Sequence, residues 1–158
     1  MTSLRLSVTS LAIGTLLAVA ALPVLAHAET HEVMMLNKDP DDKKARMVFR
    51  PEVLHIAPGD TVKFVSTDPS HNSSADADMI PEGAEPWKSK ISADFEVTLN
   101  QPGIYEYYCL PHRAMGMVGA IVVGDDLSNL DALRARKMKG KEKDRFTQIL
   151  DTIESGAK

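Results

Sequence analysis

Apolar and polar residues alternate over several short stretches in the middle of the chain. In residues 61–66 the alternation places Val62 and Phe64 on one face, and residues 95–99 repeat the same period of two. This period is typical of a half-buried β-strand. Further strand candidates are residues 32–37, 104–108 and 117–123. Because Pro-Gly turns separate several of these runs, the pattern predicts an antiparallel β-sandwich or barrel.

Three segments interrupt this strand pattern. Residues 38–46 are charged and contain a proline, which predicts a surface loop. Pro51 separates residues 47–49 from residues 53–56, which suits an edge strand interrupted by a bend. Residues 68–89 are polar and rich in turn-forming residues. The large apolar residues expected to anchor that segment are Met79, Ile80 and Trp87.

The last 34 residues change from a strand pattern to a helical one. Leu127, Leu130 and Leu133 recur at helical spacing, and Gly140 is expected to end this first helix. A second apolar stripe at positions i, i+3, i+4 and i+7 is made by Phe146, Ile149, Leu150 and Ile153. We therefore predict two short helices packed against the strands; a membrane-surface role for this tail is the less favoured alternative.

The first 28 residues have the features of a secretory signal peptide. Arg5 precedes a nearly continuous apolar run from 11 to 25, and residues 26–28 (AHA) give the small-x-small pattern of a cleavage site. A membrane anchor is the alternative, but the run is shorter than the ~20 residues that a spanning helix needs. We predict cleavage after Ala28, which leaves strands in residues 29–124 and a helical extension in residues 125–158.

Composition excludes some classes of protein. The chain has 158 residues, of which 44% are hydrophobic and 25% charged, so it has a globular composition rather than a disordered or repetitive one. Its formal net charge is −4, and removal of Arg5 with the signal peptide makes it −5. An acidic chain without a basic run is a poor nucleic-acid binder. Cys109 is the one cysteine, so no intrachain disulfide can form.

Metal-binding side chains gather in one predicted loop between two strands. Cys109 is followed by His112 three residues later, and by Met115 and Met117 six and eight residues later. A second imidazole, His71, precedes the cysteine by 38 residues in the polar segment. Two histidines, one thiolate and a weak thioether are the ligands of a blue-copper electron-transfer site. Spacing alone does not decide whether Met115 or Met117 is the axial ligand.

The mixture of ligands suits copper because Cu(II) favours nitrogen and Cu(I) favours soft sulfur. A purely structural cysteine, a thiol nucleophile with His112 as its base, and a zinc site are the alternatives. A thiol enzyme would need a third residue that orients the histidine base and a loop that binds an oxyanion, and neither is apparent in the sequence. Structural zinc sites normally use only cysteine and histidine, so they have no place for methionine. His31 and His55 are weak ligand candidates; we expect His55 to lie in the core.

In its sequence motifs the chain resembles the pseudoazurins, a family of cupredoxins, over nearly all of residues 34–158. The most specific matching stretches are the C-x2-H-x4-M loop of residues 109–117 and the segment MIPEGAE of residues 79–85. The resemblance implies an antiparallel Greek-key β-sandwich of the cupredoxin type with two C-terminal α-helices. It implies one copper ion as the cofactor. The ligands implied by matching position are His71, Cys109, His112 and Met117; Asn72 matches a residue whose backbone N–H points at the thiolate, and Met47 one that packs near His112.

The resemblance also implies a function. Pseudoazurins are periplasmic electron carriers, not enzymes, so we expect a monomer that passes electrons from a cytochrome to copper nitrite reductase or a related periplasmic reductase in denitrification. No nucleic-acid or membrane partner is expected. A periplasmic copper chaperone or buffer that uses the same ligand types is the alternative function. The docking surface is expected where His112 emerges, among Met47, Pro69, Pro111 and Ala114, with several lysines and Arg113 around it.

Some residues depart from the pseudoazurin pattern. Met34 stands where the pattern has a histidine, and Pro69 and Tyr108 stand where the family typically has lysines of its docking face. Leu110 replaces a smaller polar residue, and Arg113 replaces an aromatic residue or glycine. These departures concern the surroundings of the site and the surface that meets a partner rather than the ligand set.

Overall fold

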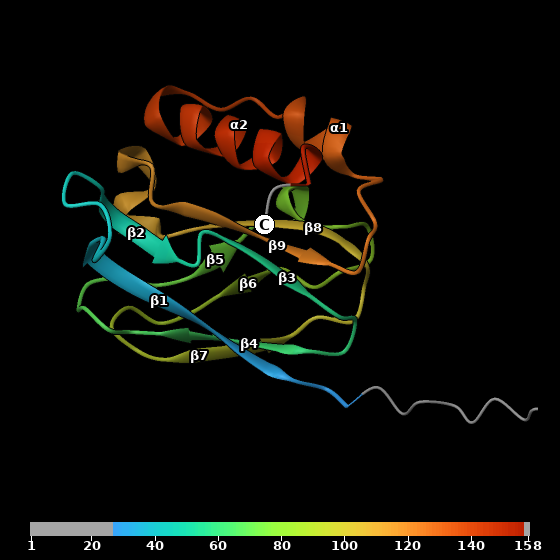
Figure 1. Cartoon of the computed structure of the whole chain (residues 1–158), viewed down its shortest axis with the longest axis horizontal. Helices are drawn as coiled ribbons and strands as arrows, with labels where there is room; N and C mark the ends of the chain where they lie inside the picture. The colour runs from blue at the N-terminus through green and yellow to red at the C-terminus, as the bar shows by residue number, and fades with distance from the viewer. Residues whose placement is uncertain (1–26, 157–158) are drawn as a thin grey trace, which may run out of the picture.

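The computed structural model describes residues 27–156, so nearly all of the predicted signal peptide lies outside the described residues. Two β-sheets lie face to face, and the C-terminal helices cover the outer side of one of them (Figure 1). The four-stranded sheet has the order β2 (Arg46–Arg50), β1 (Thr30–Lys38), β4 (Thr61–Val65), β7 (Phe95–Thr98). The five-stranded sheet has the order β3 (Val53–Ile56), β9 (Val118–Val123), β8 (Gly103–Tyr108), β5 (Ser74–Ala75), β6 (Trp87–Lys88). Among the described residues, none of the helices is long and apolar enough to cross a membrane.

The mainly β sandwich with two C-terminal helices is confirmed, but the pairing is not antiparallel throughout. β1 pairs with β4 in parallel, and β3 pairs with β9 in parallel. The predicted broken edge strand is in fact two edge strands in different sheets, β2 and β3, with Pro51 between them. Alternation identifies a strand but not its direction. A chain that crosses from one sheet to the other at Pro51 enters the second sheet in a direction that the pattern does not encode.

Aromatic side chains fill the space between the sheets. Phe49 and Phe64 both meet the Tyr107 ring edge-on, with centroid distances of 4.8 and 5.0 Å. Val62 and Phe64, predicted to share a face, are both fully buried. β8 is buried along its whole length because its outer face lies beneath the helices. This strand leads directly into Cys109, so the metal-binding loop begins from a rigid part of the molecule.

The C-terminal helices are α1 (Leu130–Arg134) and α2 (Gly140–Glu154). The predicted stripe on α2 is buried and belongs to the same hydrophobic cluster as the sheets: Phe146, Ile149, Leu150 and Ile153. Gly140 was expected to end the first helix, but it begins the second with a φ of +58°. Its left-handed backbone suits glycine, and it therefore marks the start of α2 rather than a stop signal for α1.

The segment 68–89 contains more regular structure than its composition predicts. It holds β5, β6 and a 3-10 helix, η1 (Ala77–Met79). Two-residue strands are too short to show a period, so alternation could not reveal them. The predicted anchors Met79, Ile80 and Trp87 are all buried. They hold this segment on the sandwich, where it carries His71.

Candidate metal centre

The loop that follows β8 is closed by its own backbone hydrogen bonds. The amide of Cys109 donates to the carbonyl of Met117 at 3.0 Å, and the amide of Met117 donates to the carbonyl of His112 at 3.2 Å. Between them runs a 3-10 helix, η2 (Leu110–Met115), which ends at Gly116 with a φ of +85°. These bonds fix the positions of Cys109 and His112 relative to each other before any metal binds.

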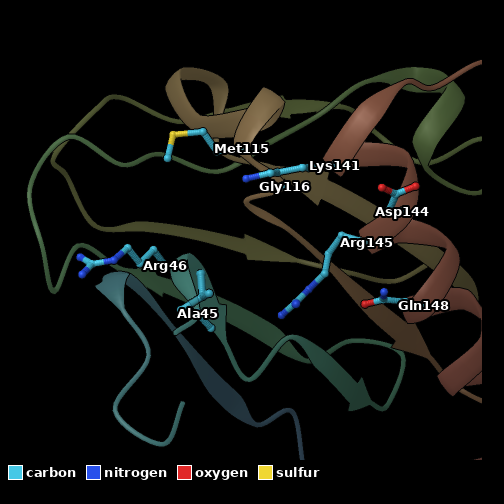
Figure 2. Close-up of a pocket in the computed structure, with 9 residues that line it drawn as sticks. Ala45, Arg46, Met115, Gly116, Lys141, Asp144, Arg145 and Gln148 are labelled. Carbon is cyan, nitrogen blue, oxygen red and sulfur yellow. The ribbon is translucent and has the colours of Figure 1, made fainter. Parts of the chain in front are cut away.

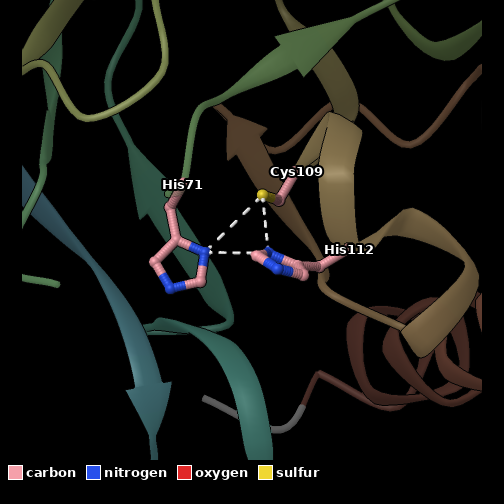
Figure 3. Close-up of side chains that lie close together, drawn as sticks. All are labelled: His71, Cys109 and His112. Carbon is pink, nitrogen blue, oxygen red and sulfur yellow. Dashed lines mark hydrogen bonds between the residues drawn. The ribbon is translucent and has the colours of Figure 1, made fainter. Parts of the chain in front are cut away.

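His71 approaches Cys109 and His112 from the opposite side of the site (Figure 3). Its side chain is fully buried, and its Nε2 lies 3.0 Å from the Oδ1 of Asn37 at the end of β1. An amide oxygen can only accept, so this contact places the imidazole proton on Nε2 and leaves a lone pair on Nδ1. Burial and the neighbouring His112 lower the pKa of His71, which favours the neutral ring that binds metal.

Three predicted ligands converge on one point. The Nδ1 atoms of His71 and His112 lie 3.1 Å apart, and the Sγ of Cys109 lies 3.7 Å from the first and 3.4 Å from the second. Figure 3 shows both imidazole rings turning these nitrogens toward the sulfur. The structure therefore brings together residues that are 38 positions apart in the sequence. Two imidazole nitrogens and one thiol sulfur around a common point form a donor set that fits copper.

The thiol of Cys109 is fully buried, and burial raises its pKa. Backbone N–H groups of Asn72 and His112 donate to the sulfur and act in the opposite direction, because they stabilise the thiolate. The Asn72 side chain accepts from the amide of Leu110 at 2.8 Å and donates to Ser74 at 3.0 Å. Asn72 thus ties the segment of His71 to the loop of Cys109.

The two loop methionines differ in their accessibility. Met117 is fully buried, whereas the side chain of Met115 is 48% exposed. Met115 lies at the rim of a cavity of about 210 Å³ that is also lined by residues of β2 and α2, and Figure 2 shows its thioether pointing away from the α2 side chains. A buried thioether is the one available to a metal bound inside the frame. This difference favours Met117 over Met115 as the weak fourth ligand.

The two weak histidine candidates lie away from the three converging ligands. His31 is on β1, where its Nε2 lies 2.9 Å from the carboxylate of Asp60. His55 was expected in the core, but it is exposed on β3. The expectation was wrong because β3 is an edge strand whose alternate positions face solvent, and a four-residue strand gives too few alternations to fix its face.

Sequence reasoning missed a polar cluster that joins the metal-binding loop to α2. Arg113, the residue after His112, donates from Nε to Glu142 of α2 at 2.7 Å and from Nη1 to Asp76 at 3.2 Å. Asp76 also accepts from the hydroxyl of Tyr108 at 3.0 Å. The sequence marked Arg113 and Tyr108 as departures from the family pattern and Arg113 as a charge near the docking surface, but it did not indicate that they share a partner. Their contact depends on how η2 and α2 pack, which no local signal encodes.

A two-sheet frame that places two histidine nitrogens and a cysteine sulfur around one point defines a cupredoxin. The model of a family described as "Copper binding proteins, plastocyanin/azurin family" matches residues 36–124. Pseudoazurin from Paracoccus pantotrophus is 45% identical over 136 residues, which cover 86% of this chain and 92% of that protein. A putative pseudoazurin from Rhizobium leguminosarum bv. viciae is 42% identical over 143 residues, or 89% and 92% of the two chains.

Solved structures give the same result. A pseudoazurin structure from Sinorhizobium superposes with a TM-score of 0.76 at 48% identity and covers 82% of this chain and 99% of that one. Native pseudoazurin from Hyphomicrobium denitrificans gives a TM-score of 0.72 at 37% identity, with 78% and 97% covered. The chain belongs to the pseudoazurin family of cupredoxins. It is therefore a blue copper electron carrier and not an enzyme, and its cofactor is one copper ion.

Proposed function

We propose that the chain is exported, cleaved after Ala28, and carries single electrons in the periplasm as a monomer. Its type 1 copper is held by His71, Cys109, His112 and Met117. The observation that carries this proposal is the convergence of three ligand atoms within 3.7 Å of one another inside a frame built by both sheets. The buried thioether of Met117 supplies the weak fourth ligand.

The protein contributes rigidity and the exclusion of water. A bound copper ion would supply a centre that gains and loses one electron. Asn37 fixes the ring of His71, Asn72 links the two ligand-bearing segments, and the closed loop fixes Cys109 relative to His112. Because these contacts are made by the fold itself, the ligand atoms need little movement between the two oxidation states. Small movement keeps the barrier to electron transfer low.

Electrons are proposed to leave through His112, which is the partly exposed ligand. Exposed apolar side chains beside it in η2 include Leu110 at 45% and Met115 at 48%. An apolar patch lets a partner approach closely without having to desolvate charges. The proposed acceptor is copper nitrite reductase or a related periplasmic reductase, and the proposed donor is a cytochrome.

The alternative function is copper handling by a periplasmic chaperone or buffer. Such a protein needs a labile site whose ligands are open to exchange. Here His71 and Cys109 are fully buried, which supports a resident copper ion instead. The two functions are separated by mixing copper-loaded protein with a stoichiometric high-affinity chelator. A carrier keeps its copper over hours and exchanges electrons with nitrite reductase on the millisecond scale of stopped flow; a buffer releases copper and leaves the reductase unreduced.

A further inference from the structure

One carboxylate at the other end of the chain's first strand holds two nitrogen atoms that can bind metal. The Oδ1 of Asp60 accepts from the backbone nitrogen of Glu29 at 2.9 Å, and its Oδ2 lies 2.9 Å from the Nε2 of His31. Asp60 is only 5% exposed, and these two contacts lower the pKa of its carboxyl group. Cleavage after Ala28 converts the nitrogen of Glu29 from an amide into the α-amine of the mature protein.

We propose that the mature amino terminus, Glu29-Thr30-His31, is a second metal site that binds one Cu(II) or Ni(II) through four nitrogen atoms. The donors are the α-amine of Glu29, the amide nitrogens of Thr30 and His31, and the Nδ1 of the His31 ring. The inference goes beyond the electron carrier and rests on that proposal in one respect only, the cleavage after Ala28.

The spacing of the donors sets the geometry. The amine of the first residue and the amide of the second close a five-membered ring on the metal, and the amides of the second and third residues close another. The amide and ring Nδ1 of a histidine close a six-membered ring, and this ring continues directly from the two five-membered rings when that histidine is the third residue. Four nitrogens linked in this way lie in one plane, which is the arrangement that Cu(II) and Ni(II) prefer. Neither Thr30 nor His31 is proline, so both amides have a proton to lose.

The rearrangement is confined to the open end of β1, where it breaks the hydrogen bond from the amide of Thr61 to the carbonyl of Glu29 and the first pairs with β4. Within residues 27–156, Thr30 and His31 pair with Thr61 and Val62 of β4 but with no strand on their other side, because β2 pairs with β1 only from Met34 onward. Glu29 and Thr30 are exposed, and the first core residue of β1 is Val33. Residues 29–31 can therefore leave the sheet while Val33 and the following pairs stay in place.

Binding must compete with protons and with Asp60. An α-amine has a pKa of about 8, and the two amides lose their protons only when the metal replaces them. Each Cu(II) bound at neutral pH therefore releases about three protons, and occupancy rises with pH. Release of the amine and His31 leaves Asp60 with the amide of Ala57, which donates to it at 3.0 Å, and with water.

The test uses mature protein whose type 1 site already holds copper, with intact mass establishing that Glu29 is the first residue. One equivalent of CuCl₂ is added at pH 8 and the electron paramagnetic resonance spectrum is recorded. The expected result is a second, tetragonal nitrogen-ligated Cu(II) signal that reaches one equivalent. His31→Ala should lose it. His55→Ala is the matched control, because His55 lines the same depression as His31 and Asp60 but cannot close the chelate rings, and it should keep the signal.

A stricter variant places one extra alanine before Glu29, which keeps the amine and the histidine but makes His31 the fourth residue. It should lose the second signal. A signal that survives this insertion, or one that depends on His55, overturns the proposal, as does a mature protein that begins at another residue. The type 1 signal in the same spectrum reports separately on the electron carrier: its loss with the second signal intact contradicts the proposed function and leaves this inference standing.

Discussion

The guanidinium carbon of Arg113 lies 4.0 Å from the centroid of the Tyr108 ring. Both side chains also bind Asp76, and Arg113 continues to Glu142 on α2. Tyr108 precedes Cys109 and Arg113 follows His112, so this contact joins the two ends of the Cys-to-His turn. Because α2 reaches the metal loop through Glu142, the helical extension takes part in holding the copper site.

We predict that Arg113→Ala lowers the free energy of unfolding of the copper-loaded protein by about 2 kcal/mol. The loss combines a partly buried cation–π contact of ~1 kcal/mol with an ion pair of similar size. Urea unfolding followed by tryptophan fluorescence measures it. Tyr108→Phe is the matched control, because it keeps the ring under the guanidinium and removes only the hydrogen bond to Asp76; it should lose less than half as much.

A double-mutant cycle tests the coupling of Arg113 to α2. Arg113→Ala and Glu142→Gln should give a combined loss smaller than the sum of the single losses, with a coupling energy of about 1 kcal/mol. Strict additivity would show that α2 does not stabilise the metal loop through this pair.

Met117 is the subject of the second prediction. Met117→Leu should retain copper and raise the reduction potential by more than about 60 mV, a tenfold change in the one-electron equilibrium, because Cu(II) loses an axial donor. Met117→Gln should lower the potential, since an amide oxygen is a harder donor that favours Cu(II). Cyclic voltammetry and the ratio of the thiolate absorption bands measure both changes.

The control for the axial assignment is Met115→Leu. The exposed thioether of Met115 lies at the rim of the cavity beside α2, so this variant should leave the potential and the spectrum nearly unchanged. If the two methionines exchange these behaviours, Met115 is the axial ligand and our assignment of the loop is wrong.

The sequence allowed prediction of the part of the site that is local. Cys109, His112 and the two methionines lie within nine residues between two strands, so spacing and ligand chemistry identify them together. His71 lies far from them in the sequence, so it could be assigned to the same site only because its imidazole can bind metal and because it matches the family pattern. The support of His71 by Asn37 was not predictable, because that contact spans 34 residues and depends on how β1 ends.

For the fold, too, the elements with a local sequence pattern were predicted and the pairings between distant segments were not. Alternation located the long strands, and the buried stripe on α2 matched its period of 3.6. The pattern did not reveal β5 and β6, which are too short, or the parallel pairing of β1 with β4, which depends on where the chain changes sheets. The contact of Arg113 with Tyr108 depends on side-chain packing across η2 and was visible only in the structure.

The third prediction concerns Glu106, which is fully buried on β8 and pairs with Arg136. Burial outweighs the charge of Arg136 and raises the pKa of Glu106 from 4.5 to about 7; Glu142 and Asp78 add to the rise. The folded protein therefore holds this proton more tightly than the unfolded chain does. Stability should fall by up to about 3 kcal/mol as pH rises from about 4.5 to about 7 and then level off.

Glu106→Gln isolates this contribution. The variant resembles the protonated side chain at every pH, so its stability relative to the wild type should increase between pH 5 and 7.5. Urea unfolding of both proteins at matched copper occupancy measures the difference. A difference that does not change with pH would mean that Arg136 keeps Glu106 ionised throughout the range.

Electrostatic steering gives the fourth prediction. Lysines in the segments that were expected, from the resemblance, to lie around the His112 end are exposed: Lys38, Lys43, Lys44, Lys88 and Lys90. Arg113 was expected among these steering charges, but Asp76 and Glu142 neutralise it. We predict that Lys88→Glu slows electron transfer to copper nitrite reductase at least about threefold at low ionic strength, and that added salt removes the difference.

Lys63→Glu is the matched control for this charge reversal. Lys63 lies on β4 of the four-stranded sheet, beside Glu32 and Asp94, whereas Lys88 lies on β6 of the five-stranded sheet. Reversing the charge of Lys63 should change the electron-transfer rate much less. Stopped-flow measurements across ionic strength compare the variants. Equal rates for both variants and the wild type would show that the lysines of this end do not guide the partner.

The spectrum of the protein loaded with one equivalent of Cu(II) tests the central claim most directly, because only a copper–thiolate bond gives the intense visible band and narrow hyperfine splitting of a type 1 site. We predict a blue or green protein whose colour disappears in Cys109→Ser, while His31→Ala keeps it. A colourless wild-type protein that binds Cu(II) would contradict the assignment of His71, Cys109 and His112 as the ligands of an electron-transfer centre.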